Sequence, residues 1–133
     1  MKRVFVLLMA IIVLLSALSL SVQAVTPRNN HTIRTGTMFS ISETGEARVY
    51  MSYEAYEDVM TEAVMTLTIK KRTLLFFWTE VTTFTTSSTS YASYHTFTRQ
   101  LDERGTYKCE VEYVVYGTAG DPDVIPFEDT VTY

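Results

Sequence analysis

The stretch RGTYKCEVEYVVYG, residues 104–117, alternates apolar and polar side chains along most of its length. One set of alternate positions holds Tyr107, Cys109, Val111, Tyr113 and Val115. Because successive side chains of a strand point to opposite faces of a sheet, this period of two predicts a long, half-buried strand. Glycines near both ends mark turns. The pattern is typical of an antiparallel sheet with one face on a core.

Further segments on both sides of this strand also have the character of strands. We predict strands at residues 38–42, 47–53, 65–70, 77–85, 91–99 and 124–133, separated by turn residues. Pro126 favours a sheet edge or a bulge for the last strand, because proline cannot donate a ladder hydrogen bond. The predicted fold class is all-β, an antiparallel β-sandwich of about seven strands.

The apolar faces of these strands define the expected core. It consists of Tyr107, Val111, Tyr113 and Val115 packed against Val49, Met51, Leu67 and Ile69. Cys109 is the only cysteine, so the chain has no internal disulfide and packing must stabilise the fold. Its place on the apolar face predicts a small buried side chain, although a free thiol can also pair between chains.

The first 24 residues are typical of a secretory signal peptide. Lys2 and Arg3 precede an almost wholly apolar run at residues 4–20, and the small residues before position 25 predict cleavage after Ala24. The alternative is an uncleaved anchor, although the run is at the short end of the about 17–25 residues that span a bilayer. The predicted organisation is a signal peptide (1–24), a flexible leader (25–36) and one secreted or cell-surface domain (37–133).

The charge of the chain argues against two classes of partner. Removing Lys2 and Arg3 with the signal peptide leaves nine basic residues against 15 acidic ones, a net charge near −6. Nucleic acid and anionic membrane surfaces both require a basic patch, so we expect neither as a partner. Membrane contact is expected only through the signal peptide before cleavage.

The segment that starts the long strand resembles a known family. Glu103, Gly105, Tyr107 and Cys109 are similar to the start of strand F in immunoglobulin domains. In that family the Tyr hydroxyl bonds back to the backbone and the Cys pairs with one in strand B. Here the candidate second strand holds no cysteine, which leaves the broader class of immunoglobulin-like (Ig-like) sandwiches. The order of segments along the chain also resembles small secreted proteins of Gram-positive bacteria, which implies the same fold and no activity.

The sequence holds no convincing catalytic constellation. The histidines are His31, in the predicted leader, and His95, which shares a strand face with Ser93. A hydrolytic triad also needs an orienting acid within hydrogen-bond reach, and one Cys with two distant His residues gives no zinc spacing. We expect no catalytic residue and no cofactor; a secreted enzyme or enzyme inhibitor built on Ser93 and His95 or on loop carboxylates is the alternative.

Two acidic residues in one turn are weak calcium candidates. Asp121 and Asp123 flank Pro122 and could offer two hard oxygen ligands at one end of the sandwich. Asp in a turn is also common for local hydrogen bonding alone. The sequence leaves both interpretations open.

An aromatic cluster gives the remaining lead to function. Phe76, Phe77 and Trp78 end a run of five apolar residues that strand alternation cannot bury completely. Either the segment packs inside or across the end of the sandwich, or it forms an exposed patch that binds a partner. We therefore predict a non-catalytic binding or cell-surface interaction module, with a surface glycan or protein as its partner.

Overall fold

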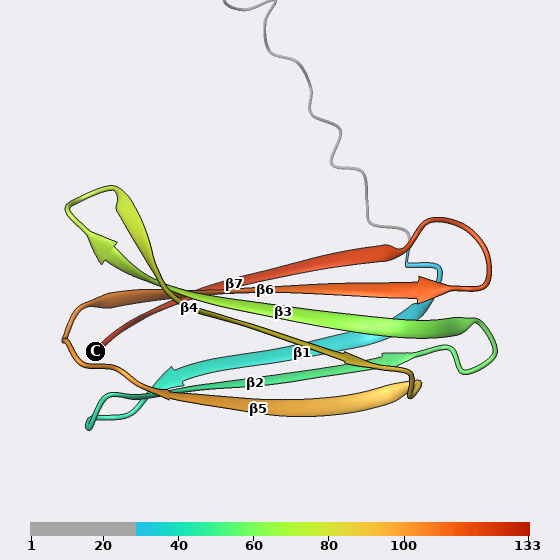
Figure 1. The fold of residues 1–133 in the computed structure, drawn as a ribbon, viewed down its shortest axis with the longest axis horizontal. Helices are drawn as coiled ribbons and strands as arrows, with labels where there is room; N and C mark the ends of the chain where they lie inside the picture. Colours follow the sequence, from blue (N-terminus) through green and yellow to red (C-terminus); the bar gives the residue numbers. More distant parts are fainter. Residues whose placement is uncertain (1–28) are drawn as a thin grey trace, which may run out of the picture.

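A computed structural model describes residues 29–133 as seven antiparallel strands in two facing sheets (Figure 1). One sheet has the order β1-β2-β5 and consists of β1 (Thr32–Ile41), β2 (Glu46–Ala55) and β5 (Ala92–Gln100). The other has the order β4-β3-β6-β7 and consists of β3 (Met60–Thr73), β4 (Phe77–Ser88), β6 (Thr106–Gly117) and β7 (Asp123–Thr132). The all-β prediction and the number of strands are confirmed.

The predicted signal peptide and residues 25–28 of the leader lie outside the described residues. Within residues 29–133 no helix is long and apolar enough to cross a membrane.

The residues predicted for the core lie between the two sheets. Each of the eight side chains expected there is at most 2% exposed: Val49, Met51, Leu67, Ile69, Tyr107, Val111, Tyr113 and Val115. β6 pairs with β3 on one side and β7 on the other, so the strand at residues 104–117 lies inside its sheet. β7 is an edge strand, as Pro126 predicted.

Side chains close the sandwich along both of its long edges. On one edge the Tyr113 hydroxyl donates a hydrogen bond of 2.9 Å to the carbonyl of Gly36, which links β6 to β1. On the other, the Phe84 ring of β4 stacks on His95 of β5, with ring centroids 4.9 Å apart. Side-chain contacts therefore join the two sheets along their edges, where no backbone ladder runs from one sheet to the other.

The first strand begins six residues before its predicted start, so the prediction of a flexible leader is wrong for residues 32–36. His31 and Thr32 are buried, at 2% and 3% exposed. The Asp123 carboxylate accepts the backbone N–H groups of Asn30, His31 and Thr32 at 2.7–2.8 Å. Asp123, more than 90 positions away, therefore anchors residues 30–32, and pairing with β2 orders the strand from Thr32 onward.

Tyr107 fixes the connection between β5 and β6. Its hydroxyl donates a hydrogen bond of 2.6 Å to the carbonyl of Glu103, four residues earlier. Its ring is 2% exposed, and burial raises the pKa of its hydroxyl. The bond holds the turn that leads into β6, and it gives the Glu103 carbonyl a hydrogen-bond donor that it would otherwise lack.

We expect Tyr107→Phe to lower the free energy of unfolding by about 1.5 kcal/mol, because it removes the hydroxyl and leaves the Glu103 carbonyl without its donor. Urea denaturation measures the change. Tyr94→Phe is the matched control, since Tyr94 is 74% exposed. Equal stability of the two variants would contradict the structural role of this bond.

Candidate functional site

The end of the β3–β4 hairpin extends beyond the rest of its sheet. The ladder between β3 and β6 ends at the pair Lys71 and Tyr107, whereas β3 and β4 continue to pair through Thr73 and Phe77. A register shift after Ile69 marks a bulge, which increases local twist. Figure 1 shows this end, in yellow-green, rising away from both sheets.

The turn of this hairpin and the first residue of β4 present four consecutive large apolar side chains to solvent. We call residues 74–77 the apolar tip: Leu74 is 82% exposed, Leu75 79%, Phe76 83% and Phe77 64%. The interpretation that this segment packs inside the sandwich is therefore wrong for these four residues. These side chains are exposed because the hairpin extends beyond its sheet, and neither a third strand nor the facing sheet reaches residues 74–77.

Trp78 lies at the base of the apolar tip, on the outer face of the four-stranded sheet. It is half-buried, with the Arg72 guanidinium 4.9 Å and the Lys108 ammonium 5.0 Å from its ring centroid. Both distances are within the range of cation–π attraction. The ring is thus held by two cations below the exposed turn.

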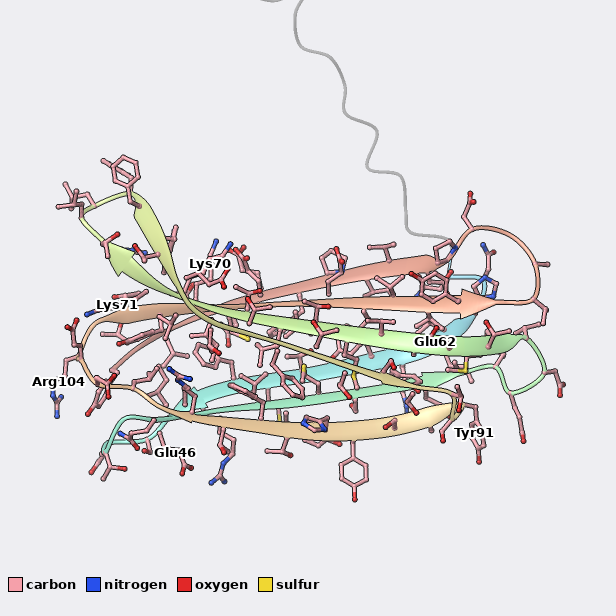
Figure 2. The ribbon with its side chains drawn as sticks, viewed as in Figure 1. Glu46, Glu62, Lys70, Lys71, Tyr91 and Arg104 are labelled. Carbon is pink, nitrogen blue, oxygen red and sulfur yellow. The ribbon has the colours of Figure 1, made fainter. Side chains whose placement is uncertain are left out.

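Ion pairs fix the strands that carry these cations. Glu110 bonds Lys70 at 2.5 Å and Lys108 at 2.7 Å, and these two bonds lower the pKa of its carboxyl. On the other face, Lys71 pairs with Glu103. Figure 2 places Lys70 at the base of the overhanging hairpin and Lys71 and Arg104 at the same end of the sandwich. Ion pairs therefore hold the strands in place directly below the exposed tip.

The chemistry of this site suits binding. Residues 70–79 include three basic side chains and no acidic one, and the four tip side chains hold no polar atom. Neither a nucleophile with a base nor a set of metal ligands is present in this segment. The site can bury apolar surface and attract negative charge next to it.

A second surface lies on the outer face of the three-stranded sheet. It is a shallow groove of about 590 Å³ beside Gly36, with Tyr50 and Tyr94 along one side. The two rings stack with centroids 6.4 Å apart, and Arg34 and Glu54 form a 2.6 Å ion pair at the groove. Sequence reasoning missed this groove; its only signal was two tyrosines on strand positions that face water.

Ser93 and His95 lie on β5, but the structure uses His95 in packing. Its ring stacks on Phe84. Among residues 29–133, no hydrogen bond joins His95 to an acidic side chain or to Ser93. The described geometry does not assemble the triad that the enzyme alternative needs.

The two calcium candidates have other contacts. Both carboxylate oxygens of Asp123 accept backbone N–H bonds, and the carbonyl of Asp121 lies 3.2 Å from Nε2 of His31. Burial alone would raise the pKa of Asp123, but the N–H groups of residues 30–32 outweigh it and hold the pKa below its ordinary value. In the described part of the chain no three His, Cys, Asp or Glu residues gather as metal ligands.

Cys109 is fully buried, as predicted. Burial, with smaller contributions from the charges of Asp129 and Glu110, raises the pKa of its thiol to about 12. Because the thiolate is the reactive form, this side chain behaves as a core hydrophobe at neutral pH.

Comparison with known proteins found no matching family model, curated protein or solved structure. Of the predicted binding residues, the structure places Phe76 and Phe77 in the exposed apolar tip and Trp78 at its base. Leu74 and Leu75, which the prediction omitted, complete the patch; the uninterrupted apolar run was the signal for them.

Proposed function

We propose that this protein is a secreted, non-catalytic binding module that contacts a cell-surface partner through the apolar tip. The observation that carries the proposal is the exposure of four adjacent large apolar side chains, each 64–83% exposed, on an overhanging hairpin. Scattered apolar residues on a surface need no explanation, but a contiguous patch marks an interaction site.

The backbone of the tip gives independent support. Leu74 has φ +59°, in the left-handed region where a bulky side chain costs about 1 kcal/mol or more. Glycine or asparagine would relieve this cost. A large apolar side chain at such a position is unfavourable for the fold and for solubility, which is the pattern expected where the side chain serves binding.

We further propose that the sandwich is Ig-like. Two features support this: Tyr107 bonds back to the chain four residues earlier, and it stands two residues before the buried Cys109, as in the tyrosine corner of that fold. The long strand β6 would then be strand F. In that family a buried Trp lies on strand C, next to strand F. Here β3 is the strand that holds this place beside β6, whereas Trp78 lies on β4.

The class of partner decides which surface makes contact. A glycan needs hydrogen-bond partners for its hydroxyls, which the tip side chains cannot supply. The groove offers Arg34, Glu54 and Ser52 next to Tyr94, an exposed ring on which a sugar can stack. An apolar partner would use the tip. Tyr94→Ala and tip variants therefore separate the two classes.

The tip is tested by binding of the protein to intact cells, and a panel of cell-wall glycans tests the groove. We expect the double variant Leu75→Ser, Phe76→Ser to lose at least about tenfold in cell affinity, since it removes two exposed apolar anchors. Its stability should stay within about 0.5 kcal/mol of the parent, because neither side chain packs in the core.

Tyr91→Ser is the matched control. Tyr91 is also exposed, at 51%, and Figure 2 places it at the opposite end of the sandwich from the hairpin. We expect this variant to bind cells as the parent does. Leu74→Asn should weaken binding while leaving stability equal or higher, because asparagine tolerates the left-handed backbone. Unchanged cell binding by both tip variants would contradict the proposed site.

A further inference from the structure

The shape of the apolar tip restricts what can cover it. Residues 74–76 form the connection between β3 and β4, and Phe77 is the first residue of β4. Side chains that leave from consecutive positions of a turn form a convex end, since they cannot share one flat face. A protein partner would need a deep apolar socket of matching shape, whereas a lipid interface deforms around a protruding apolar group.

The backbone limits how deeply the tip can enter lipid. Pairing between β3 and β4 ends at Thr73 and Phe77, so residues 74–76 have no strand partner. Backbone N–H and C=O groups without partners are not tolerated in the hydrocarbon region. The tip can therefore insert its side chains at the level of the headgroups and the adjoining acyl chains, with its turn backbone still hydrated.

The residues below the tip suit that level of the membrane. Trp78 is the kind of amphipathic ring that gathers at membrane–water interfaces. Arg72 lies over it and takes part in none of the ion pairs found among residues 29–133. A guanidinium with no acidic partner is available for a lipid phosphate.

Net charge does not oppose this contact. The expectation that the domain avoids anionic membranes rested on the total of about −6 for the processed chain. That excess lies elsewhere: near the base, Glu80, Glu103, Glu110 and Glu128 are matched in number by Lys70, Lys71, Lys108 and Arg72. Because salt screens charges over about 8 Å at physiological ionic strength, the charge close to the tip matters more than the net charge of the chain.

Resting on the proposed function, we propose that the surface bound by the apolar tip is a phospholipid bilayer that carries anionic headgroups. The tip side chains enter the interface, with Trp78 at headgroup level and Arg72 on a lipid phosphate. The tip thus docks the domain reversibly on a membrane, independently of any N-terminal segment.

Trp78 provides the measurement, because it is the only tryptophan of the chain. The protein is collected from the medium of an expressing host, and mass spectrometry establishes that parent and variants share one N-terminus. With vesicles of phosphatidylcholine containing about 30 mol% phosphatidylglycerol, we expect the emission of Trp78 to shift to shorter wavelength. Brominated lipids should quench it, which a membrane contact made only by the N-terminus would not do.

Two variants test the assigned roles by vesicle sedimentation. Leu75→Ser, Phe76→Ser should lower the partition coefficient at least about tenfold. Arg72→Gln should reduce the preference for phosphatidylglycerol over pure phosphatidylcholine about threefold, because one phosphate contact is lost. Tyr91→Ser should change neither. An unaltered preference in Arg72→Gln would overturn the role given to Arg72.

The same variants distinguish failure of this inference from failure of the proposed function. If the parent binds cells through its tip but neither partitions into vesicles nor shows quenching of Trp78, the lipid inference is overturned and the tip still binds another surface component. If vesicle binding persists unchanged in the tip variant, the inference is overturned as well. If the parent binds neither cells nor vesicles, both proposals fail.

Discussion

Replacing Asp123 with Asn is expected to lower the free energy of unfolding by about 3 kcal/mol at neutral pH. The carboxylate is 5% exposed and accepts three backbone N–H groups from residues 30–32. Hydrogen bonds to a charged acceptor contribute about 1.5–3 kcal/mol each, and an amide turns one acceptor into a donor that faces N–H groups. Urea denaturation of both proteins measures the loss.

The loss should depend on pH in a defined direction. The pKa of Asp123 in the folded chain lies below its ordinary value of 3.8, so its stabilising contribution is complete above that value. The contribution falls as the pH drops through the folded-state pKa. The stability difference between parent and Asp123→Asn should therefore be constant from pH 5 to 7 and shrink below about pH 4.

Asp121→Asn is the control for this effect. Asp121 lies two residues away with its side chain exposed, and its contact with His31 uses the backbone carbonyl. We expect a change below about 0.5 kcal/mol. If both variants lose the same amount, then general charge in the β6–β7 connection, and not the anchoring of β1, sets the stability.

A methyl group added at Gly117 is expected to cost about 3 kcal/mol. A side-chain carbon built there would overlap the imidazole of His31, which is 2% exposed and cannot swing into solvent. Overpacking a filled site costs about 1–3 kcal/mol, and here the displaced ring also carries the anchored segment at the start of β1. Thermal denaturation of Gly117→Ala measures the effect.

A double-mutant cycle identifies the cause. In a His31→Ala background the ring is gone, so Gly117→Ala should cost less than about 1 kcal/mol. The same cost in both backgrounds would mean that the backbone of residue 117, rather than the ring, requires glycine. This pair of residues also tests whether the start of β1 is part of the cooperative fold.

The substitutions at Asp123 and Gly117 both act on the start of β1, whose order the local sequence pattern could not predict. Residues 29–36 show no apolar period, and the sequence therefore predicted a flexible leader. Asp123 holds residues 30–32 and Gly117 makes room for His31, both from more than 80 positions away in the chain, and residues 34–36 pair with β2. Polar anchoring across such a separation follows no local rule, because it depends on which segments the fold brings together.

The exposure of the candidate site also depends on residues far away in the chain, so the sequence indicated the segment but not its surroundings. The run ending at Trp78 was evident as too apolar for alternation, which marked the segment whose residues 74–77 the structure leaves exposed. Whether Phe76 and Phe77 pack inside or face solvent depends on where the neighbouring strands stop. The ladder of β3 with β6 ends at Lys71, so the turn has nothing to pack against.

The sequence by itself determined the presence of seven strands and the buried faces of β2, β3 and β6, because side chains alternate across a strand whatever its neighbours are. Only the tertiary structure decided which strands pair, that β1 starts at Thr32, and that the apolar tip stands free. These outcomes depend on contacts between residues far apart in the chain. The alternation of side chains along a strand shows which residues share a face, but it carries no information about how far the neighbouring strands extend.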